Sequence, residues 1–137
     1  MQISGNNLIL QSQAFDVTWS KLGTVVANDA LAPDNTLTAD RVYPGSSGAD
    51  KGCYQAQSHA AGAYTQSIYA KAAGINFIGF YDLDNATKVA WFNLSTGALG
   101  TVHGSVTATI SDEGGGWYRC TGLCAQPTGG WGQWKTG

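Results

Sequence analysis

Residues 64–74 read Tyr-Thr-Gln-Ser-Ile-Tyr-Ala-Lys-Ala-Ala-Gly, the longest run of the chain in which side chains alternate cleanly. In an extended strand, successive side chains point to opposite faces. One face is fairly apolar and carries Tyr64, Gln66, Ile68 and Ala70. The other face carries hydroxyls, an aromatic ring and a cation, from Thr65, Ser67, Tyr69 and Lys71. One buried and one solvated face is typical of antiparallel sheets, so we expect a central strand whose polar face belongs to a binding surface.

Short stretches of the same kind recur along the chain, and no segment shows a convincing helical period. They lie at residues 8–10, 24–27, 38–43, 53–57, 76–83, 88–94, 106–111 and 117–124. The runs 76–83 and 88–94 flank an Asp-Asn turn and are expected to pair as a hairpin. Many short strands separated by glycine-rich turns are typical of sandwiches and jelly rolls. The sequence therefore predicts one domain over residues 1–137, all-β, an antiparallel two-sheet β-sandwich (jelly roll).

Composition excludes some classes of partner. Only 12% of the residues are charged and the net charge is −2, so no basic field exists to hold a nucleic acid. No apolar run approaches the ~20 residues that cross a bilayer, and we expect no membrane insertion. The first seven residues have no positive or apolar signal region. Either the protein is not exported by the Sec route, or the chain is a piece of a longer one.

The cysteines are expected to be buried, reduced thiols, and they are Cys53, Cys120 and Cys124. Four residues of strand separate Cys120 from Cys124 by ~13 Å, beyond the ~4.4–6.8 Å between Cα atoms that a disulfide tolerates. They pair only if a turn at Gly122 breaks the strand. A zinc site would have to recruit His59 or His103 from distant loops.

Five short blocks follow one another in a fixed order between residues 7 and 120, with Gln55 between the second and the third. They read Asn-Leu-Ile-Leu-Gln-Ser-Gln-Ala-Phe from Asn7 with Trp19 beyond it, Ala-Pro-Asp-Asn-Thr-Leu-Thr-Ala-Asp from Ala32, Tyr-Thr-x-Ser-x-Tyr-Ala-Lys from Tyr64, Phe-Asn-Leu-Ser-Thr-Gly from Phe92, and Gly-Trp-Tyr-Arg-Cys from Gly116. In this order the blocks resemble a carbohydrate-binding-module-like jelly-roll domain of phage tail and tailspike proteins. The resemblance implies a virion or extracellular protein that is made in the cytoplasm.

Two departures from that family pattern stand out. Gln66 occupies a position where the family usually has an apolar residue. Relatives of this kind also look longer beyond the Trp-Tyr-Arg-Cys block, so either the final strand is unusual or the fragment ends before the native domain does.

Residues for catalysis are not grouped in a recognisable pattern. A glycosidase needs two carboxylates that face each other across a sugar, and the acidic residues near potential clefts are Asp82, Asp84, Asp112 and Glu113. Asp84 and Asp112 fit turn positions, where Asp caps its own backbone. No Ser or Cys lies in a nucleophile elbow beside a histidine. We expect a protein that is not an enzyme.

Aromatic residues are the strongest functional signal, with five Trp, six Tyr and four Phe. Phe15, Phe80, Phe92 and Trp117 are expected in the core, Trp117 as a plug after three glycines. If Phe92 points inward, Trp91 points outward, and a flat exposed ring beside amide and ammonium groups is suited to hold a sugar. If the strands share a sheet, a single patch would join the predicted ligand-binding residues Trp91, Tyr69, Lys71, Asn93 and Tyr81. Trp131 and Trp134 form either a second platform or an edge strand that docks to a larger protein.

The function expected from these residues is non-catalytic carbohydrate binding, as an adhesion module for a polysaccharide or cell-surface glycan. The alternative is a structural or decoration module of a phage particle that packs on neighbouring chains of a larger phage or multidomain protein. A module that serves an attached enzyme is a weaker third reading. No cofactor and no metal ligand set is expected, although a structural calcium ion stays open, with turn carboxylates such as Asp34 as contributors.

Overall fold

The computed structural model describes residues 17, 20–21, 23–44, 52–54, 61–81, 89–126 and 133–136. Over these ranges the chain forms strands and turns. The strands are β1 (Ser20–Lys21), β2 (Gly23–Ala30), β3 (Ala39–Pro44), β4 (Gly52–Tyr54), β5 (Gly62–Lys71), β6 (Phe77–Tyr81), β7 (Val89–Asn93), β8 (Ala98–Val102), β9 (Val106–Gly114), β10 (Trp117–Gln126) and β11 (Gln133–Thr136). No helix long and apolar enough to cross a membrane occurs in this part of the chain.

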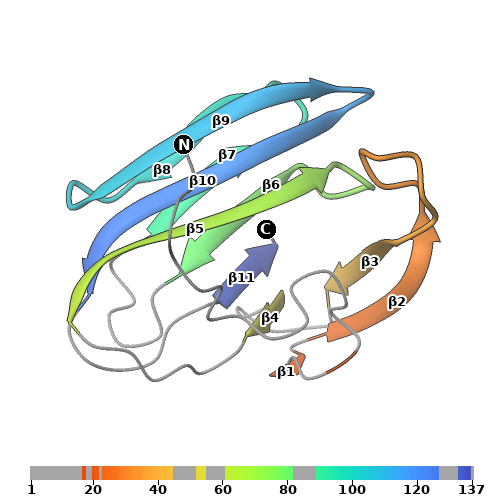
Figure 1. The fold of residues 1–137 in the computed structure, drawn as a ribbon, viewed down its shortest axis with the longest axis horizontal. Helices are drawn as coiled ribbons and strands as arrows, with labels where there is room; N and C mark the ends of the chain where they lie inside the picture. Colours follow the sequence, from red (N-terminus) through yellow and green to blue (C-terminus); the bar gives the residue numbers. More distant parts are fainter. Residues whose placement is uncertain are drawn as a thin grey trace.

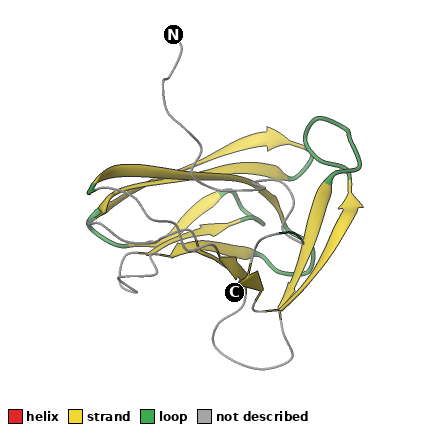
Figure 2. Ribbon diagram, turned by 60° about the horizontal axis from the view of Figure 1, so that its bottom comes forward, coloured by secondary structure: helices red, strands yellow, loops and turns green. Residues whose placement is uncertain are grey.

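The strands form three antiparallel sheets (Figure 1). One sheet has six strands in the order β1-β4-β11-β6-β7-β8, a second has three in the order β5-β10-β9, and β2 pairs with β3 alone. Figure 2 shows the two larger sheets as layers, with the β2–β3 hairpin beside them at one end. The prediction of an all-β antiparallel sandwich is confirmed, and the jelly-roll order of its strands stays a prediction.

The core lies between the two larger sheets. Its buried members are Ala70, Ile78, Phe80, Ala90, Phe92, Leu94 and Cys120. Phe80 and Phe92 pack edge to face with ring centroids 5.1 Å apart. The sheets are in close contact where Phe80 of β6 meets Gly122 of β10, because a Cβ on Gly122 would lie 2.8 Å from Phe80 Cδ2. Glycine at this position therefore leaves the space that the phenylalanine ring fills.

The alternation predicted for residues 64–71 is confirmed. Ile68 and Ala70 face the core, while Thr65, Ser67, Tyr69 and Lys71 are exposed. The prediction that this strand, β5, is central in its sheet is wrong among the described strands. β10 has neighbours on both sides, whereas β5 pairs with β10 alone. Alternation reports which faces are buried, but it carries no information about the number of neighbours.

The predicted hairpin of residues 76–83 and 88–94 is confirmed as β6 and β7, with Ile78 opposite Phe92. β8 is absent from the predicted stretches, because the small and turn-forming residues from Ser95 to Gly100 show no alternation. The edge position considered for the strand around Trp134 is wrong, because β11 lies between β4 and β6. The residues 8–10 strand, Phe15 and Trp19 lie outside the described residues.

The thiol prediction is confirmed for Cys120, which is free and fully buried. β10 runs unbroken through Gly122, which pairs with Gln66 on β5, so no turn brings Cys120 towards Cys124. Burial raises the pKa of the Cys120 thiol to about 12. The side chains of Cys53 and Cys124 lie outside the described residues.

Candidate functional site

The predicted platform residue Trp91 lies on the outer face of the six-stranded sheet. Its strand neighbours Ala90 and Phe92 are fully buried, so period-two geometry turns Trp91 outward as expected. The indole covers Gly79 on β6, where a Cβ would lie 2.8 Å from Trp91 Cε3. Gly100 lies beside Trp91 on β8, where a Cβ added to the glycine would lie 3.1 Å from Trp91 Cβ. Trp91 is consequently half-buried on an open sheet face, and its role in ligand binding stays a prediction.

Asn93 holds the turn between β7 and β8. Its side-chain Oδ1 accepts hydrogen bonds from the backbone N–H groups of Ser95 (2.9 Å) and Thr96 (3.2 Å). Its backbone carbonyl accepts a third from Gly97 N (2.9 Å). The carboxamide oxygen is thus engaged in the turn, and only the NH₂ group is left for a ligand.

The single patch predicted from the sequence does not form. Tyr69 and Lys71 belong to the three-stranded sheet and Trp91 to the six-stranded sheet. Each lies on the side of its own sheet that faces away from the shared core. The two groups therefore lie on opposite outer faces of the sandwich, because the condition that their strands share a sheet is not met.

The remaining predicted residues are placed only in part. Tyr81 lies in β6 opposite Val89 and Gln133, and Trp134 lies in β11 opposite Phe80. The side chains of both, and the whole of Trp131, lie outside the described residues.

The prediction that Trp117 fills the core is also wrong. The inward positions of β10 are Cys120 and Gly122, so Trp117 and Arg119 point to the outer face. Trp117 is half-buried there, directly opposite Lys71 of β5. Counting back in twos from the buried cysteine would have given this direction, but the three preceding glycines suggested a buried anchor instead.

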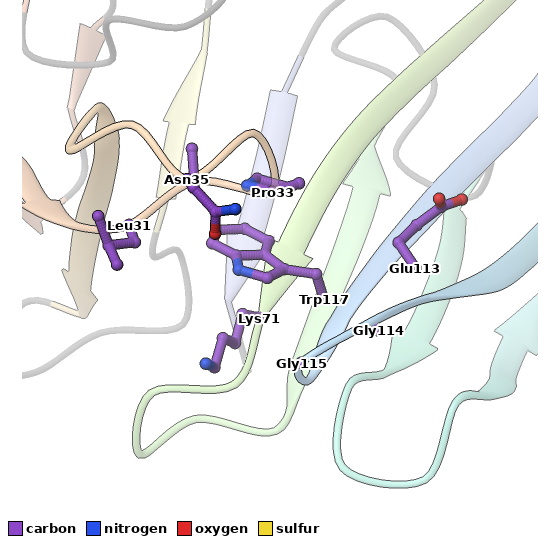
Figure 3. Close-up of a pocket in the computed structure, with 9 residues that line it drawn as sticks. Leu31, Pro33, Asn35, Lys71, Glu113, Gly114, Gly115 and Trp117 are labelled. Atoms are coloured by element: carbon purple, nitrogen blue, oxygen red, sulfur yellow. The ribbon is translucent and has the colours of Figure 1, made fainter.

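The Trp117 ring lines a cleft of about 340 Å³ between the sheet and the β2–β3 loop (Figure 3). We call this the Trp117 cleft, and it is lined by Leu31, Ala32, Pro33, Asn35, Lys71, Glu113, Gly114, Gly115 and Trp117. Figure 3 shows the ring facing Pro33 and Asn35, with Lys71 beside it and Glu113 on the neighbouring strand. Among the residues that the structure describes, Lys71 is the one predicted ligand-binding residue that lines the cleft.

One wall of the cleft is a loop that is fastened by its own hydrogen bonds. Asp34 Oδ1 accepts from Thr36 N (3.0 Å) and Thr36 Oγ1 (2.6 Å), and Ala32 N donates to Thr36 O (2.8 Å). The bonds from Thr36 hold the pKa of the Asp34 carboxyl below its ordinary value. Asn35 adopts a positive φ of 64°, which asparagine tolerates better than most residues. The loop therefore presents Asn35 to the cleft in a fixed place.

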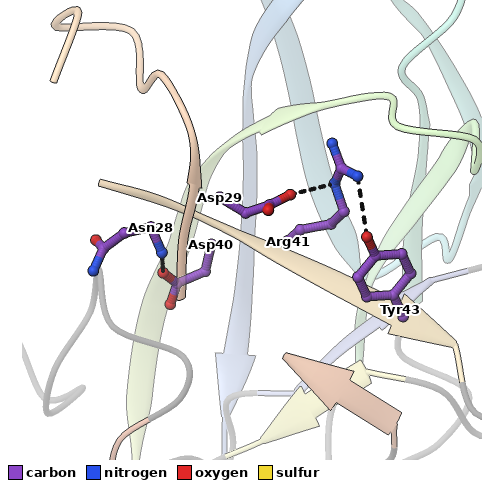
Figure 4. A network of polar contacts seen from close by, with 5 residues as sticks. All are labelled: Asn28, Asp29, Asp40, Arg41 and Tyr43. Carbon is purple, nitrogen blue, oxygen red and sulfur yellow. Dashed lines mark hydrogen bonds and ion pairs between the residues drawn. The ribbon is translucent and has the colours of Figure 1, made fainter. Parts of the chain in front are cut away.

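The hairpin that carries this loop is held together by polar contacts (Figure 4). Arg41 Nε lies 2.9 Å from Asp29 Oδ2, and Arg41 Nη1 donates to the Tyr43 hydroxyl at 3.0 Å. The Tyr43 hydrogen bond, followed by the charge of Asp29, raises the pKa of Arg41. Asn28 N donates to Asp40 Oδ1 (3.0 Å) where the register of β2 and β3 shifts. Arg41 is thus occupied within the hairpin, away from the cleft.

The opposite wall is the turn between β9 and β10. Gly115 and Gly116 have φ of 63° and 86°, the positive values that tight two-residue hairpin turns require. The register shifts just before the turn, since Asp112 pairs with Tyr118 and Gly114 with Trp117. This leaves Glu113 as an extra residue, a bulge of the kind that redirects a side chain.

Hydrogen bonds hold the two carboxylates of this wall, and the stem of Lys71 packs beside it. Glu113 accepts a hydrogen bond from Ser111 Oγ (2.9 Å). The stem of Lys71 runs along Gly116, where a Cβ would lie 3.2 Å from Lys71 Cε. Asp112 Oδ1 accepts from Gly114 N (2.8 Å), so that carboxylate serves the turn.

Metal ligands do not gather at this site. Within the described ranges no group of three His, Cys, Asp or Glu side chains is placed to hold a metal ion. Asp82, Asp84 and His59 lie outside those ranges. Chemically, the Trp117 cleft offers a flat ring, one ammonium, one carboxylate and one carboxamide.

Comparison with protein-family models and with curated proteins returns no match for this chain. The likeness to phage carbohydrate-binding modules accordingly stays a prediction.

Proposed function

We propose that the domain is a non-catalytic carbohydrate-binding module whose glycan enters the Trp117 cleft. The observation that carries this proposal is the half-buried indole of Trp117 between Asn35, Lys71 and Glu113. A flat aromatic ring packs against the C–H face of a sugar. The amide, ammonium and carboxylate groups supply both donors and acceptors for hydroxyls.

Concavity favours this cleft over the Trp91 surface. A concave site surrounds more of a small ligand than an open sheet face does. The loop and turn walls are also fixed by internal hydrogen bonds, so little ordering is required when a ligand binds. Trp91, on the other face, is the alternative platform if the glycan does not enter the cleft.

The absence of catalysis is part of the proposal. Glycoside hydrolysis generally uses two carboxyl groups across the scissile bond. Among the described residues that line the cleft, Glu113 carries the single carboxylate, and Ser111 donates to it. By the sequence resemblance, the module would belong to a phage-type or other extracellular protein.

Retention on polysaccharide columns tests the proposal. Trp117→Ala should lose retention that the parent shows, while Trp91→Ala, which removes an indole from the opposite face, should keep it. If only Trp91→Ala loses retention, the glycan binds at the Trp91 surface and not in the Trp117 cleft. A parent that binds no polysaccharide on a broad glycan array would refute the function.

A second candidate is a structural or decoration module. Leu31 and Leu37 at the hairpin loop are 56% and 59% exposed, and they could pack on a neighbouring chain. This function predicts self-association or docking that Leu37→Ser weakens, with no effect of sugars on the melting temperature. Sedimentation velocity of the two proteins separates it from glycan binding.

A further inference from the structure

Aromatic and cationic side chains are paired across two strands beside the Trp117 cleft. Trp117 is directly opposite Lys71, and Arg119 is directly opposite Tyr69. Opposed residues of an antiparallel pair share one face, with Cβ atoms roughly 4.5–5.5 Å apart. Lys71 and Arg119 are exposed, and Tyr69 keeps 49% of its surface exposed. The four side chains therefore form one contiguous strip, which starts in the cleft and continues along β10 and β5.

The strip is cationic although the chain is acidic. Within the described part of the structure, neither Lys71 nor Arg119 has an ion pair or side-chain hydrogen bond. The nearby carboxylate of Glu113 accepts from Ser111, and that of Asp112 accepts from Gly114 N. A chain of net charge −2 thus places two cations without an ion-pair partner beside two aromatic rings, with the Glu113 carboxylate nearby.

We infer that the ligand is an acidic polysaccharide whose sugar rings carry carboxylates, a polyuronate in chemical class. This inference rests on the proposed function and names the ligand of the same site. One ring would pack on Trp117 with its carboxylate at Lys71, and the next sugars would follow β10 towards Tyr69 and Arg119. Guanidinium matches a carboxylate in a planar, two-bonded geometry. Asn35 and Glu113, which also line the cleft, would bind hydroxyls.

The charge distribution favours a polyuronate over a nucleic acid. A phosphate backbone carries one charge per nucleotide and is bound by a dense positive field. Two cations with an adjacent carboxylate fit a chain in which hydroxyls outnumber charges. Single-stranded nucleic acid can also stack on aromatic rings, so it serves as a comparison ligand.

Polygalacturonate and its fully methyl-esterified form provide the test, because they differ only in the charge of the carboxyl groups. Calorimetry of the intact chain should give tighter binding to the acid form, and that binding should weaken as salt rises. Lys71→Gln and Arg119→Gln should each weaken it roughly 3- to 10-fold, the range of a partly exposed charge-assisted contact. Lys71→Arg should retain most of it. Lys21→Gln, in β1 of the other sheet, makes the same change in net charge and should leave binding unchanged.

Equal or tighter binding of the esterified form would overturn the inference and leave glycan binding intact. The same holds if Lys71→Gln and Arg119→Gln, folded by circular dichroism, bind polygalacturonate as the parent does. Tighter binding of single-stranded DNA than of polygalacturonate would also overturn it. A chain that binds neither these polymers nor any glycan of an array would refute the proposed function as well.

Discussion

At the scale of single residues, glycines opposite large rings are what allow the rings to pack. Gly79 lies under Trp91, Gly122 under Phe80, and Gly97 under Tyr118, whose Cε1 would be 2.7 Å from a Cβ at that position. Contacts this short cannot accommodate a methyl group without displacing the ring. The packing of the aromatic residues therefore depends on residues that have no side chain.

Gly122→Ala should destabilise the domain by about 1–3 kcal/mol, since the added methyl group overpacks the core against Phe80. Urea denaturation measures the change. Gly104→Ala is the matched control, because nothing lies within 4 Å of a Cβ at that position. Equal stability of the two variants would mean that the sheets are not in contact at Gly122.

Cys120 should make stability fall at alkaline pH. Burial raises the pKa of its thiol from 9.0 to about 12, so the folded state keeps a proton that the unfolded state loses above pH 9. Its contribution is complete below pH 9 and disappears as the pH rises towards 12. Cys120→Ala should show a shallower loss of stability over this interval than the parent, by urea denaturation at successive pH values. Identical slopes would contradict the buried, protonated thiol.

At the scale of elements, the loop over residues 31–38 acts through its internal hydrogen bonds. Asp34 and Thr36 close it, and Asn35 and Pro33 face the cleft from it. The loop therefore shapes the cleft, whereas the two larger sheets supply the core.

Asp34→Ala should reduce polysaccharide retention while the melting temperature stays close to that of the parent. The change removes the acceptor of two bonds from Thr36, and Asp34 itself is exposed. Asp34→Asn retains an oxygen at the same place and should bind better than the alanine variant. Retention equal in all three proteins would show that the loop does not shape the site.

The hydrogen bonds between Asp34 and Thr36 should also make binding depend on pH. The pKa of Asp34 is lowered in the folded state, so the carboxylate contacts are fully present above its ordinary value of 3.8 and are lost as pH falls through the lowered value. Retention on methyl-esterified polygalacturonate, whose carboxyl groups do not titrate, should hold down to about pH 4 and decline below it. A pH titration on this immobilised polymer checks the prediction.

At the scale of the whole molecule, two aromatic residues separate stability from function. Phe92 is fully buried between the sheets, so Phe92→Ala should cost ~3–5 kcal/mol. Trp117 is half-buried on the outer face, and Trp117→Ala should cost clearly less while abolishing binding. Thermal melts and column retention of both variants give the comparison. If Trp117→Ala lowers the stability as much as Phe92→Ala does, Trp117 is a core residue after all.

Sequence periodicity predicted which face of each strand is exposed, but it did not predict which strands pair with one another. The alternation at 64–71 and around Phe92 correctly placed Tyr69, Lys71 and Trp91 on outer surfaces. It could not show that these residues belong to different sheets, because pairing between distant strands is set by long-range packing. Trp117 was misassigned because the bulge at Glu113 and the glycine turn leave no periodic signal in front of it. The cleft itself joins residues 31–35 to residues 113–117, which no local pattern connects.

The glycine turn at residues 114–116 also limits how the specificity of such a site can change over generations. All three residues have positive φ, a conformation that costs other L-residues roughly 1–2 kcal/mol each. New side chains are therefore disfavoured on that wall, and its outline is inherited nearly unchanged. Variation that adapts the cleft to another ligand would accumulate instead at Leu31, Ala32 and Pro33 of the facing loop, because Asn35 shares the positive φ. A library randomised at these three positions should yield altered glycan preference far more often than one randomised in the turn.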